Sequence, residues 1–208
     1  MTRRPTKRVS RPGLSAPSYL DGQLLIAMPS MRDPRFAGSV IYMCAHSGQG
    51  AMGLIINQKA RDISFGELLV QTRVLKDASA LRLPPPIRGM PVHVGGPVDI
   101  ERGFVLHSAE YAADNSTMAI DDGVSLTSTI DILRAIANGR GPDRALLALG
   151  YAGWSAGQLE RELQANGWLH CEATPELVFD VSIEEKYARA LSTIGIDPAQ
   201  LVSEAGHA

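Results

Sequence analysis

The stretch from Val40 to Asn57 limits what this chain can fold into more than any other part of it. It reads VIYMCAHSGQGAMGLIIN, two apolar runs joined by the small and polar segment SGQG. The apolar residues in each run are continuous rather than alternating, which is typical of strands covered on both faces. The glycines of the joining segment, Gly48 and Gly50, favour a turn of a few residues. The sequence therefore predicts a β-hairpin inside a folded domain.

Length and composition indicate one soluble globular domain. The 208 residues suit a single core, because such cores grow to roughly 250 residues. The apolar and charged fractions, 45% and 20%, are ordinary, and no apolar run approaches the roughly 20 residues that cross a bilayer. The N-terminus is basic but has no apolar segment of the secretory kind. We expect a cytoplasmic protein without a membrane role.

Positive charge is concentrated at the N-terminus. Residues 1–16 carry five of the 20 lysines and arginines and no acid, which leaves 15 against 22 acids, a net charge of −7, on the rest of the chain. We expect residues 1–16 to be a disordered basic tail and residues 17–208 to form the domain. Because an acidic surface repels phosphate, direct DNA binding by the folded part is disfavoured. The alternative is contact between the tail alone and nucleic acid or an acidic surface.

The two cysteines, Cys44 and Cys171, lie in apolar or mixed surroundings without a CxxC or Cys/His cluster. This pattern favours small buried residues in a reducing compartment over a zinc site. A disulfide or a reactive thiol is the alternative.

Turn residues and apolar runs divide the domain into interspersed strands and helices. Besides the hairpin, we expect strands near 24–27, 92–94, 103–107, 118–120, 144–151 and 177–179. Helices are expected after Ser64, from Ser128 to Ala137, after Ser155 and from Ser182, with capping-box spacing after Ser64 and Ser155. No regular βαβ rhythm is present, so the pattern indicates an α+β fold with a mixed sheet rather than a doubly wound fold.

Several blocks of the sequence resemble one protein family, in the same order along the chain. They are LDGQLLIAMPSMRDPRF, GAMGLIINQ, VHVGGPV, RGFVLH, ALGYAGWSAGQLERELQANGWL, and ELVFD with the helix that follows it. Together they cover about Tyr19 to Ile196, which makes the match far more specific than a lone glycine motif. On these blocks the chain resembles the AlgH/YqgE family of uncharacterised bacterial proteins.

The resemblance implies a fold and little chemistry. The implied fold is a single α+β domain with a mixed, bifurcated sheet, part of it barrel-like, flanked by helices. The family is commonly labelled as candidate transcriptional regulators, after a member linked to exopolysaccharide production. It supplies no catalytic residue that can be carried onto this sequence, and residues 1–16 lie outside the matching blocks.

Three histidines, His46, His93 and His107, fall in or at the ends of neighbouring predicted strands. If they met, three imidazoles would be able to bind a metal or act as acid and base near neutral pH. No HExxH or other ligand spacing links them. We therefore expect ordinary hydrogen-bonded histidines, no metal and no cofactor.

Two short motifs each allow a functional and a structural interpretation. Gly95 and Gly96 suit an anion-holding nest or a tight turn, and the turn is favoured because no helix start follows. Ser155 lies in G-W-S-A-G, which matches the G-x-S-x-G nucleophile elbow between a strand and a helix. The hydrolase order needs an acid and then a histidine, and only His170 and His207 follow, so we expect Ser155 to be a helix N-cap.

The sequence thus predicts a non-enzymatic regulatory or interaction protein that acts on transcription indirectly, through an unknown protein partner or small ligand. The alternative is an enzyme or small-ligand-binding protein. Its pocket is expected near the strand ends that carry His46, Asn57, Gly95, Gly96 and His107. Several of these groups within hydrogen-bond reach of one another would favour the alternative, and separate, individually satisfied side chains favour the first function.

Overall fold

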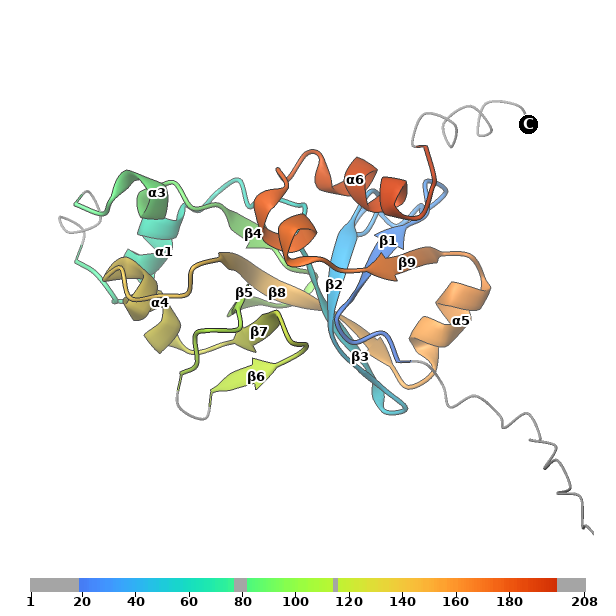
Figure 1. Ribbon diagram of the computed structural model, residues 1–208, viewed down its shortest axis with the longest axis horizontal. Coiled ribbons are helices and arrows are strands. Elements are labelled where there is room, and N and C mark those ends of the chain that lie inside the picture. The colour runs from blue at the N-terminus through green and yellow to red at the C-terminus, as the bar shows by residue number, and fades with distance from the viewer. Residues whose placement is uncertain (1–18, 77–81, 114–115, 198–208) are drawn as a thin grey trace, which may run out of the picture.

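A curled sheet organises the part of the chain that the computed structural model describes, residues 19–76, 82–113 and 116–197 (Figure 1). Its strands are β1 (Gln23–Ala27), β2 (Val40–Ser47), β3 (Gly50–Ile55), β4 (Val92–Val94), β5 (Val98–Ser108), β6 (Thr117–Ala119), β7 (Val124–Thr127), β8 (Ala145–Ser155) and β9 (Trp168–Glu172). The strands pair in the order β6-β7-β5-β8-β3-β2-β1-β9, and β4 pairs with β8 beside this path.

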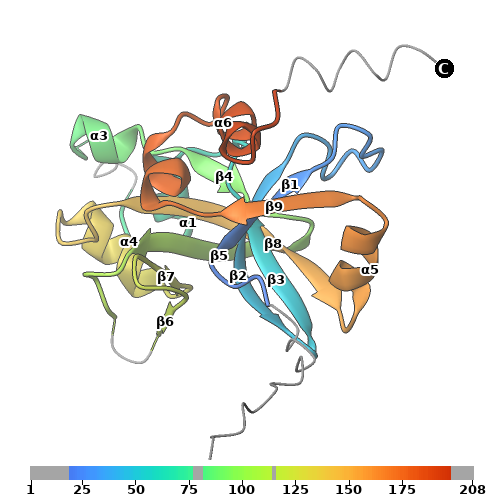
Figure 2. The same cartoon turned by 45° about the vertical axis from the view of Figure 1, so that its right-hand side comes forward.

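The sheet branches at β8. Residues Leu147 to Leu149 pair in parallel with β4 and antiparallel with β5, whereas Ala152 to Ser155 pair antiparallel with β3. One long strand therefore exchanges neighbours along its length, and the sheet curls as half a barrel (Figure 2). This confirms the predicted fold class, α+β in a single domain with a mixed, bifurcated sheet that is partly barrel-like and flanked by helices.

The predicted hairpin is present as β2 and β3. Every residue of the run Val40–Cys44 is buried, and successive side chains enter different cores, Tyr42 one cluster and Ile41 another. Both faces of β2 are thus covered, which explains the continuous apolar run in the sequence. The strands are joined by Gly48 and Gln49, since Ser47 pairs with Gly50.

Helices cover both faces and one end of the sheet. They are α1 (Phe65–Gln71), α3 (Pro85–Arg88), α4 (Ile130–Ala137), α5 (Gln158–Gln164), the π-helix η1 (Glu176–Asp180) and α6 (Lys186–Thr193). One core lies under η1 and α6, a second under α5, and a third where α1 and α4 pack on β5 and β8. Figures 1 and 2 show α1, α3 and α4 at the end of the molecule opposite α5.

Helix starts follow the sequence signals in one case and depart from them in another. The capping box before α1 is confirmed, because Ser64 Oγ accepts from the Glu67 amide at 3.3 Å and the Glu67 carboxylate accepts from the Ser64 amide at 2.7 Å. Before α4, Thr129 and not Ser128 is the N-cap residue, and its hydroxyl contacts the Ser116 hydroxyl at 3.3 Å instead of capping the helix.

The segment Leu177–Phe179, predicted as a strand, belongs to η1. Lys186 closes the end of this π-helix, where its Nζ donates to the carbonyls of Val178 at 2.8 Å and Val181 at 2.9 Å. Burial lowers the pKa of Lys186 to about 8. A short apolar run has no periodicity that separates a buried strand from a buried helix, so the sequence does not reveal this turn.

The remaining expectations concern strands, cysteines, the N-terminal tail and membrane spans. The sequence does not predict β7 or β9, and β5 and β8 are longer than predicted. Cys44 and Cys171 are free and buried, as predicted, and burial raises the pKa of both thiols. The predicted tail, residues 1–16, lies outside the described residues. Among the described helices, none has the length and apolarity that a bilayer span requires.

Candidate functional site

His46, near the end of β2, is tied into the fold through both ring nitrogens. The side chain is buried, and its Nδ1 accepts from the Leu20 amide at 3.1 Å. Because a backbone N–H can only donate, the ring proton lies on Nε2, which donates to Glu160 Oε1 at 3.0 Å. The Tyr19 ring packs edge-on at 5.2 Å. His46 therefore joins the start of the domain and α5 to the hairpin.

Asn57 follows β3 and closes the open end of the hairpin. Its Oδ1 accepts from the Val40 amide at 2.7 Å, and its Nδ2 donates to the Gly38 carbonyl at 2.9 Å. Both ends of the side-chain amide thus satisfy backbone groups at the start of β2.

Gly95 and Gly96 carry the chain across β8, from the edge that pairs with β4 to the edge that pairs with β5. Gly95 donates to the Leu149 carbonyl at 2.7 Å and accepts from the Ile55 amide at 2.8 Å. A Cβ on Gly96 would lie 2.1 Å from the carbonyl carbon of Tyr151. The predicted tight turn is therefore replaced by a crossing that needs close backbone contact, with glycine as the only residue that fits.

His107 on β5 ends a directed chain of hydrogen bonds. Its Nδ1 lies 3.0 Å from the Ser108 carbonyl and must donate, so Nε2 accepts from the Thr127 hydroxyl at 2.9 Å. The Thr127 hydroxyl in turn accepts from Thr117 at 2.8 Å, and Thr117 accepts from the Ala113 amide at 2.9 Å. Burial lowers the pKa of His107. The chain joins β5, β7 and β6.

His93 on β4 is buried as a neutral ring. It is 3% exposed, and its Nδ1 donates to the Leu147 carbonyl at 3.0 Å. Burial, with smaller contributions from the charges of Lys186 and Lys59, lowers the pKa of His93 to about 4. In the folded state His93 therefore stays neutral at pH values where the same side chain in the unfolded chain, with an ordinary pKa of about 6.5, is protonated.

This difference predicts a loss of stability in mild acid. The unfolded state binds the proton first, so the contribution of neutral His93 is complete above about pH 6.5 and is lost as pH falls toward 4. At pH 5 the expected loss is about 2 kcal/mol. Urea unfolding at pH 7.5 and 5 should show a smaller pH effect in His93→Gln than in the wild type or in the exposed control His170→Gln. An unchanged pH effect in His93→Gln would contradict the assignment.

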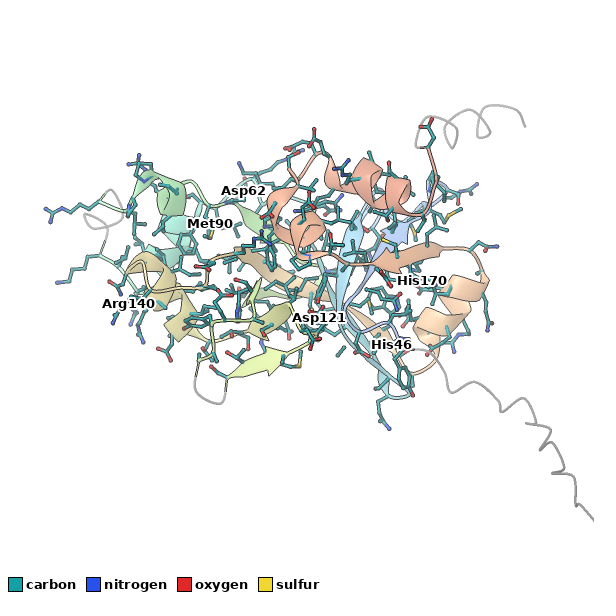
Figure 3. All side chains as sticks on the ribbon, viewed as in Figure 1. His46, Asp62, Met90, Asp121, Arg140 and His170 are labelled. Carbon is teal, nitrogen blue, oxygen red and sulfur yellow. The ribbon has the colours of Figure 1, made fainter. Side chains whose placement is uncertain are left out.

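The hydrogen bonds and backbone contacts of the five residues predicted from the sequence place them in different parts of the described structure. Asn57 and Gly95 lie on adjoining segments, because the Ile55 amide bonds to Gly95, whereas His46 lies beside α5 and His107 lies between β5 and β7. Figure 3 shows His46 well separated from Arg140 at the α4 end of the molecule. Among the described residues, no group of three or more His, Cys, Asp or Glu side chains is placed to hold a metal ion.

Ser155 ends β8 and is not the N-cap of α5, since Gly157, with φ of 70°, occupies that position. Its amide and hydroxyl both donate to Gln158 Oε1, at 3.0 and 3.1 Å. The glutamine side chain thus reaches back as in a capping box, but the serine oxygen does not accept from the helix. The Ser155 hydroxyl donates to the side-chain amide oxygen of Gln158 and not to a histidine.

The same helix binds both tryptophans of the chain. Glu162 Oε2 accepts from the indole N–H groups of Trp154 at 2.9 Å and Trp168 at 2.8 Å, and its Oε1 accepts from Gln158 at 2.9 Å. The two rings lie edge to face, 5.9 Å between centroids. One carboxylate therefore fastens α5 to β8 and β9.

An open groove of about 420 Å³ lies where β8 passes from β5 to β3. Arg102 is its charged lining residue, with the guanidinium carbon 5.1 Å from the centroid of the Phe104 ring. Tyr151 meets the same ring edge-on at 5.8 Å. The lining residues are Ala45, Ser47, Gln49, Gly50, Ala51, Met52, Arg102, Phe104, Tyr151 and Trp154, none of which is among the five nominated residues.

Comparison with known proteins identifies the chain's relatives. The family model described as AlgH-like matches residues 24–199. The chain belongs to the AlgH family. Family proteins named UPF0301 are 62% identical over 194 residues in Beijerinckia indica, covering 93% of this chain and 95% of the relative, and 60% identical over 193 residues in Methylobacterium nodulans, covering 93% and 92%.

Solved structures agree with this membership. The solution structure of the AlgH protein from Pseudomonas aeruginosa superposes with a TM-score of 0.73 at 42% identity, covering 94% of this chain and 99% of that one. A crystal structure of a Corynebacterium diphtheriae protein, at 20% identity, shares the fold with a TM-score of 0.61 over 82% of this chain and 86% of its own.

In this AlgH-family chain, sequence reasoning does not single out the groove. Arg102 and Phe104 stand two residues apart in the family block RGFVLH, a spacing that places both side chains on one face of a strand. This two-residue spacing is the sequence signal that points to the groove. The approach of Tyr151 and the hairpin residues depends on how β8 crosses between its neighbours, which the sequence does not show.

Proposed function

We propose that this AlgH-family protein is a non-enzymatic regulatory or interaction protein of the cytoplasm that acts through a protein partner and affects transcription indirectly. The observation that carries the proposal is the use of its histidines. His46, His93 and His107 are buried in separate places, and each is hydrogen-bonded within the fold. These three imidazoles, of the kind best suited to acid–base chemistry near neutral pH, thus support the structure.

A projecting part of β5 offers a contact surface for such a partner. Val98 pairs with Tyr151 and Gly103 with Leu149, so residues 99–102 bulge out beside the single residue between those two β8 positions. Ile100 is 65% exposed there. Asp99 before it adopts φ of 47°, a strained conformation for a residue with a Cβ, and such strain is often retained at functional sites.

The charge of the chain favours a protein partner over DNA. With residues 1–16 set aside, the remaining residues carry a net charge of −7, and duplex phosphate would be repelled by such a surface. An indirect effect on transcription is consistent with this balance.

The test is quantitative capture of proteins and metabolites from the native cell extract with the full chain as bait. We expect a protein that is retained by the wild type and by Met118→Glu but reduced at least about tenfold by Ile100→Glu. Met118 is the matched control because it is an exposed apolar residue, 43% exposed, on another strand, β6.

Two results would contradict this function. One is enrichment of a metabolite that the purified protein converts to a product, without an enriched protein. The other is tight, salt-sensitive and sequence-selective binding of duplex DNA by the chain without residues 1–16.

The alternative from the sequence, an enzyme or ligand-binding protein with a pocket at His46, Asn57, Gly95, Gly96 and His107, stays a prediction. The separate positions and internal hydrogen bonds of these residues give it no support.

A further inference from the structure

The groove between β5, β8 and the hairpin contains hydrogen-bonding groups that the fold itself does not use. Across the described residues, the Arg102 guanidinium has its contact with the Phe104 ring and neither a carboxylate nor a carbonyl partner. The Tyr151 hydroxyl and the Gln49 side-chain amide likewise have no hydrogen-bond partner among the described residues. By contrast, the polar atoms of His46, Asn57 and Glu162 are fully engaged in the fold.

These groups are mainly donors, and one of them, the Arg102 guanidinium, carries a positive charge. A guanidinium presents five N–H donors and accepts no hydrogen bond. Its planar arrangement of donors matches the oxygens of a carboxylate or a phosphate. No acidic residue lines the groove. Its electrostatics therefore favour a ligand that ends in an anionic, oxygen-rich group.

The remaining lining favours a flat apolar body attached to that anion. Tyr151 supplies ring surface next to Arg102, and Met52 is a partly buried apolar lining residue. Phe104 is 3% exposed and packs against the Arg102 guanidinium. A volume of about 420 Å³ falls in the range of small-molecule sites, roughly 300–1,000 Å³.

We propose that this groove binds a small aromatic anion, a planar ring that bears a carboxylate or phosphate. The anionic group pairs with the Arg102 guanidinium, and the ring lies against Tyr151 and Met52, with Gln49 and the Tyr151 hydroxyl as further hydrogen-bonding groups. The site uses none of the five residues predicted from the sequence. Arg102 also belongs to the bulge of residues 99–102, but the ligand proposal does not rest on the interaction role.

The experiment is an amide-shift NMR titration of the full chain with phenyl phosphate. We expect saturable shifts centred on Gly50, Arg102 and Tyr151, with a dissociation constant of about 1 mM or tighter. Inorganic phosphate and benzyl alcohol, which each supply half of the ligand's chemistry, should bind at least about tenfold more weakly. This comparison separates an aromatic-anion site from a phosphate site or an apolar hollow.

Matched variants assign the binding to Arg102. Arg102→Ala should weaken phenyl phosphate at least about tenfold, and Arg102→Lys should weaken it less, because lysine keeps the charge but not the planar fork. Arg140→Ala is the control, since Arg140 is an exposed arginine at the α4 end of the molecule (Figure 3). It should bind phenyl phosphate as the wild type does.

Three outcomes would overturn the proposal. They are no saturable shifts at about 10 mM phenyl phosphate, shifts that map outside the groove, and an equal affinity in Arg102→Ala and wild type. The titration uses purified protein without a partner, so its failure leaves the proposed interaction role standing.

Discussion

Gly96→Ala is expected to prevent this chain from folding. A Cβ at this position would lie 2.1 Å from the Tyr151 carbonyl carbon and 2.3 Å from the Ala152 amide nitrogen, and both are backbone atoms in the middle of β8. Gly96 also has a backbone φ of 153°, a value that residues with a side chain rarely adopt. Relief would require β8 to move away from two of its neighbours. We expect a loss above about 4 kcal/mol, enough to remove most of the stability of a typical domain.

The measurement is the soluble yield of the variant, followed by circular dichroism and urea unfolding of any soluble fraction. Gly48→Ala is the matched control, because a Cβ there would have the Tyr19 hydroxyl, at 3.6 Å, as its nearest atom. This control should stay within about 0.5 kcal/mol of the wild type. A Gly96→Ala protein with the wild-type urea midpoint would contradict the close approach of Gly96 to the backbone of β8.

Glu162→Ala is expected to cost about 3 kcal/mol in free energy of unfolding. The change removes the acceptor of two indole N–H groups, and each hydrogen bond to a charged acceptor contributes roughly 1.5–3 kcal/mol. Trp154 and Trp168 are 7% and 4% exposed, so water replaces the carboxylate poorly. Both tryptophans of the chain are in this network, and intrinsic fluorescence therefore reports on it directly. The urea midpoint followed by fluorescence should fall, and the emission of the folded variant should change.

Two further variants separate the hydrogen bonds from the helix itself. Glu162→Gln keeps an oxygen for the indoles but turns an N–H₂ group toward the Gln158 donor, so its loss should be intermediate. Gln164→Ala changes an exposed residue of the same helix and should leave the midpoint near that of the wild type. If Glu162→Ala and Gln164→Ala unfold alike, the two indole bonds contribute little.

Two local signals in the sequence predict the local structure correctly. The hairpin follows from two continuous apolar runs around Gly48 and Gly50, and the start of α1 follows from Ser64 and Glu67 three residues apart. In each case the groups that make the contact lie within a few residues of one another, so the pattern and the contact coincide.

The positions of the candidate site residues could not be predicted in this way, because they depend on contacts between strands that are distant in the sequence. Histidines in neighbouring strands suggest a shared site, yet the described structure turns each one toward a different partner, Glu160 for His46 and Thr127 for His107. Those partners lie 114 and 20 residues away in the chain. No spacing rule reports such pairings.

The sequence by itself indicated an α+β domain, because apolar periodicity and glycine position act over short distances, and its ordered blocks carried the resemblance to the AlgH family. The tertiary structure alone decided that Gly95 and Gly96 cross β8, that Leu177–Phe179 coils into a π-helix beneath Lys186, and that Arg102 faces an open groove. The physical reason is that the partner of each polar group is set by packing and hydrogen bonding between segments that are distant in the sequence. Here those contacts depend on the pairing of β8 with β3, β4 and β5.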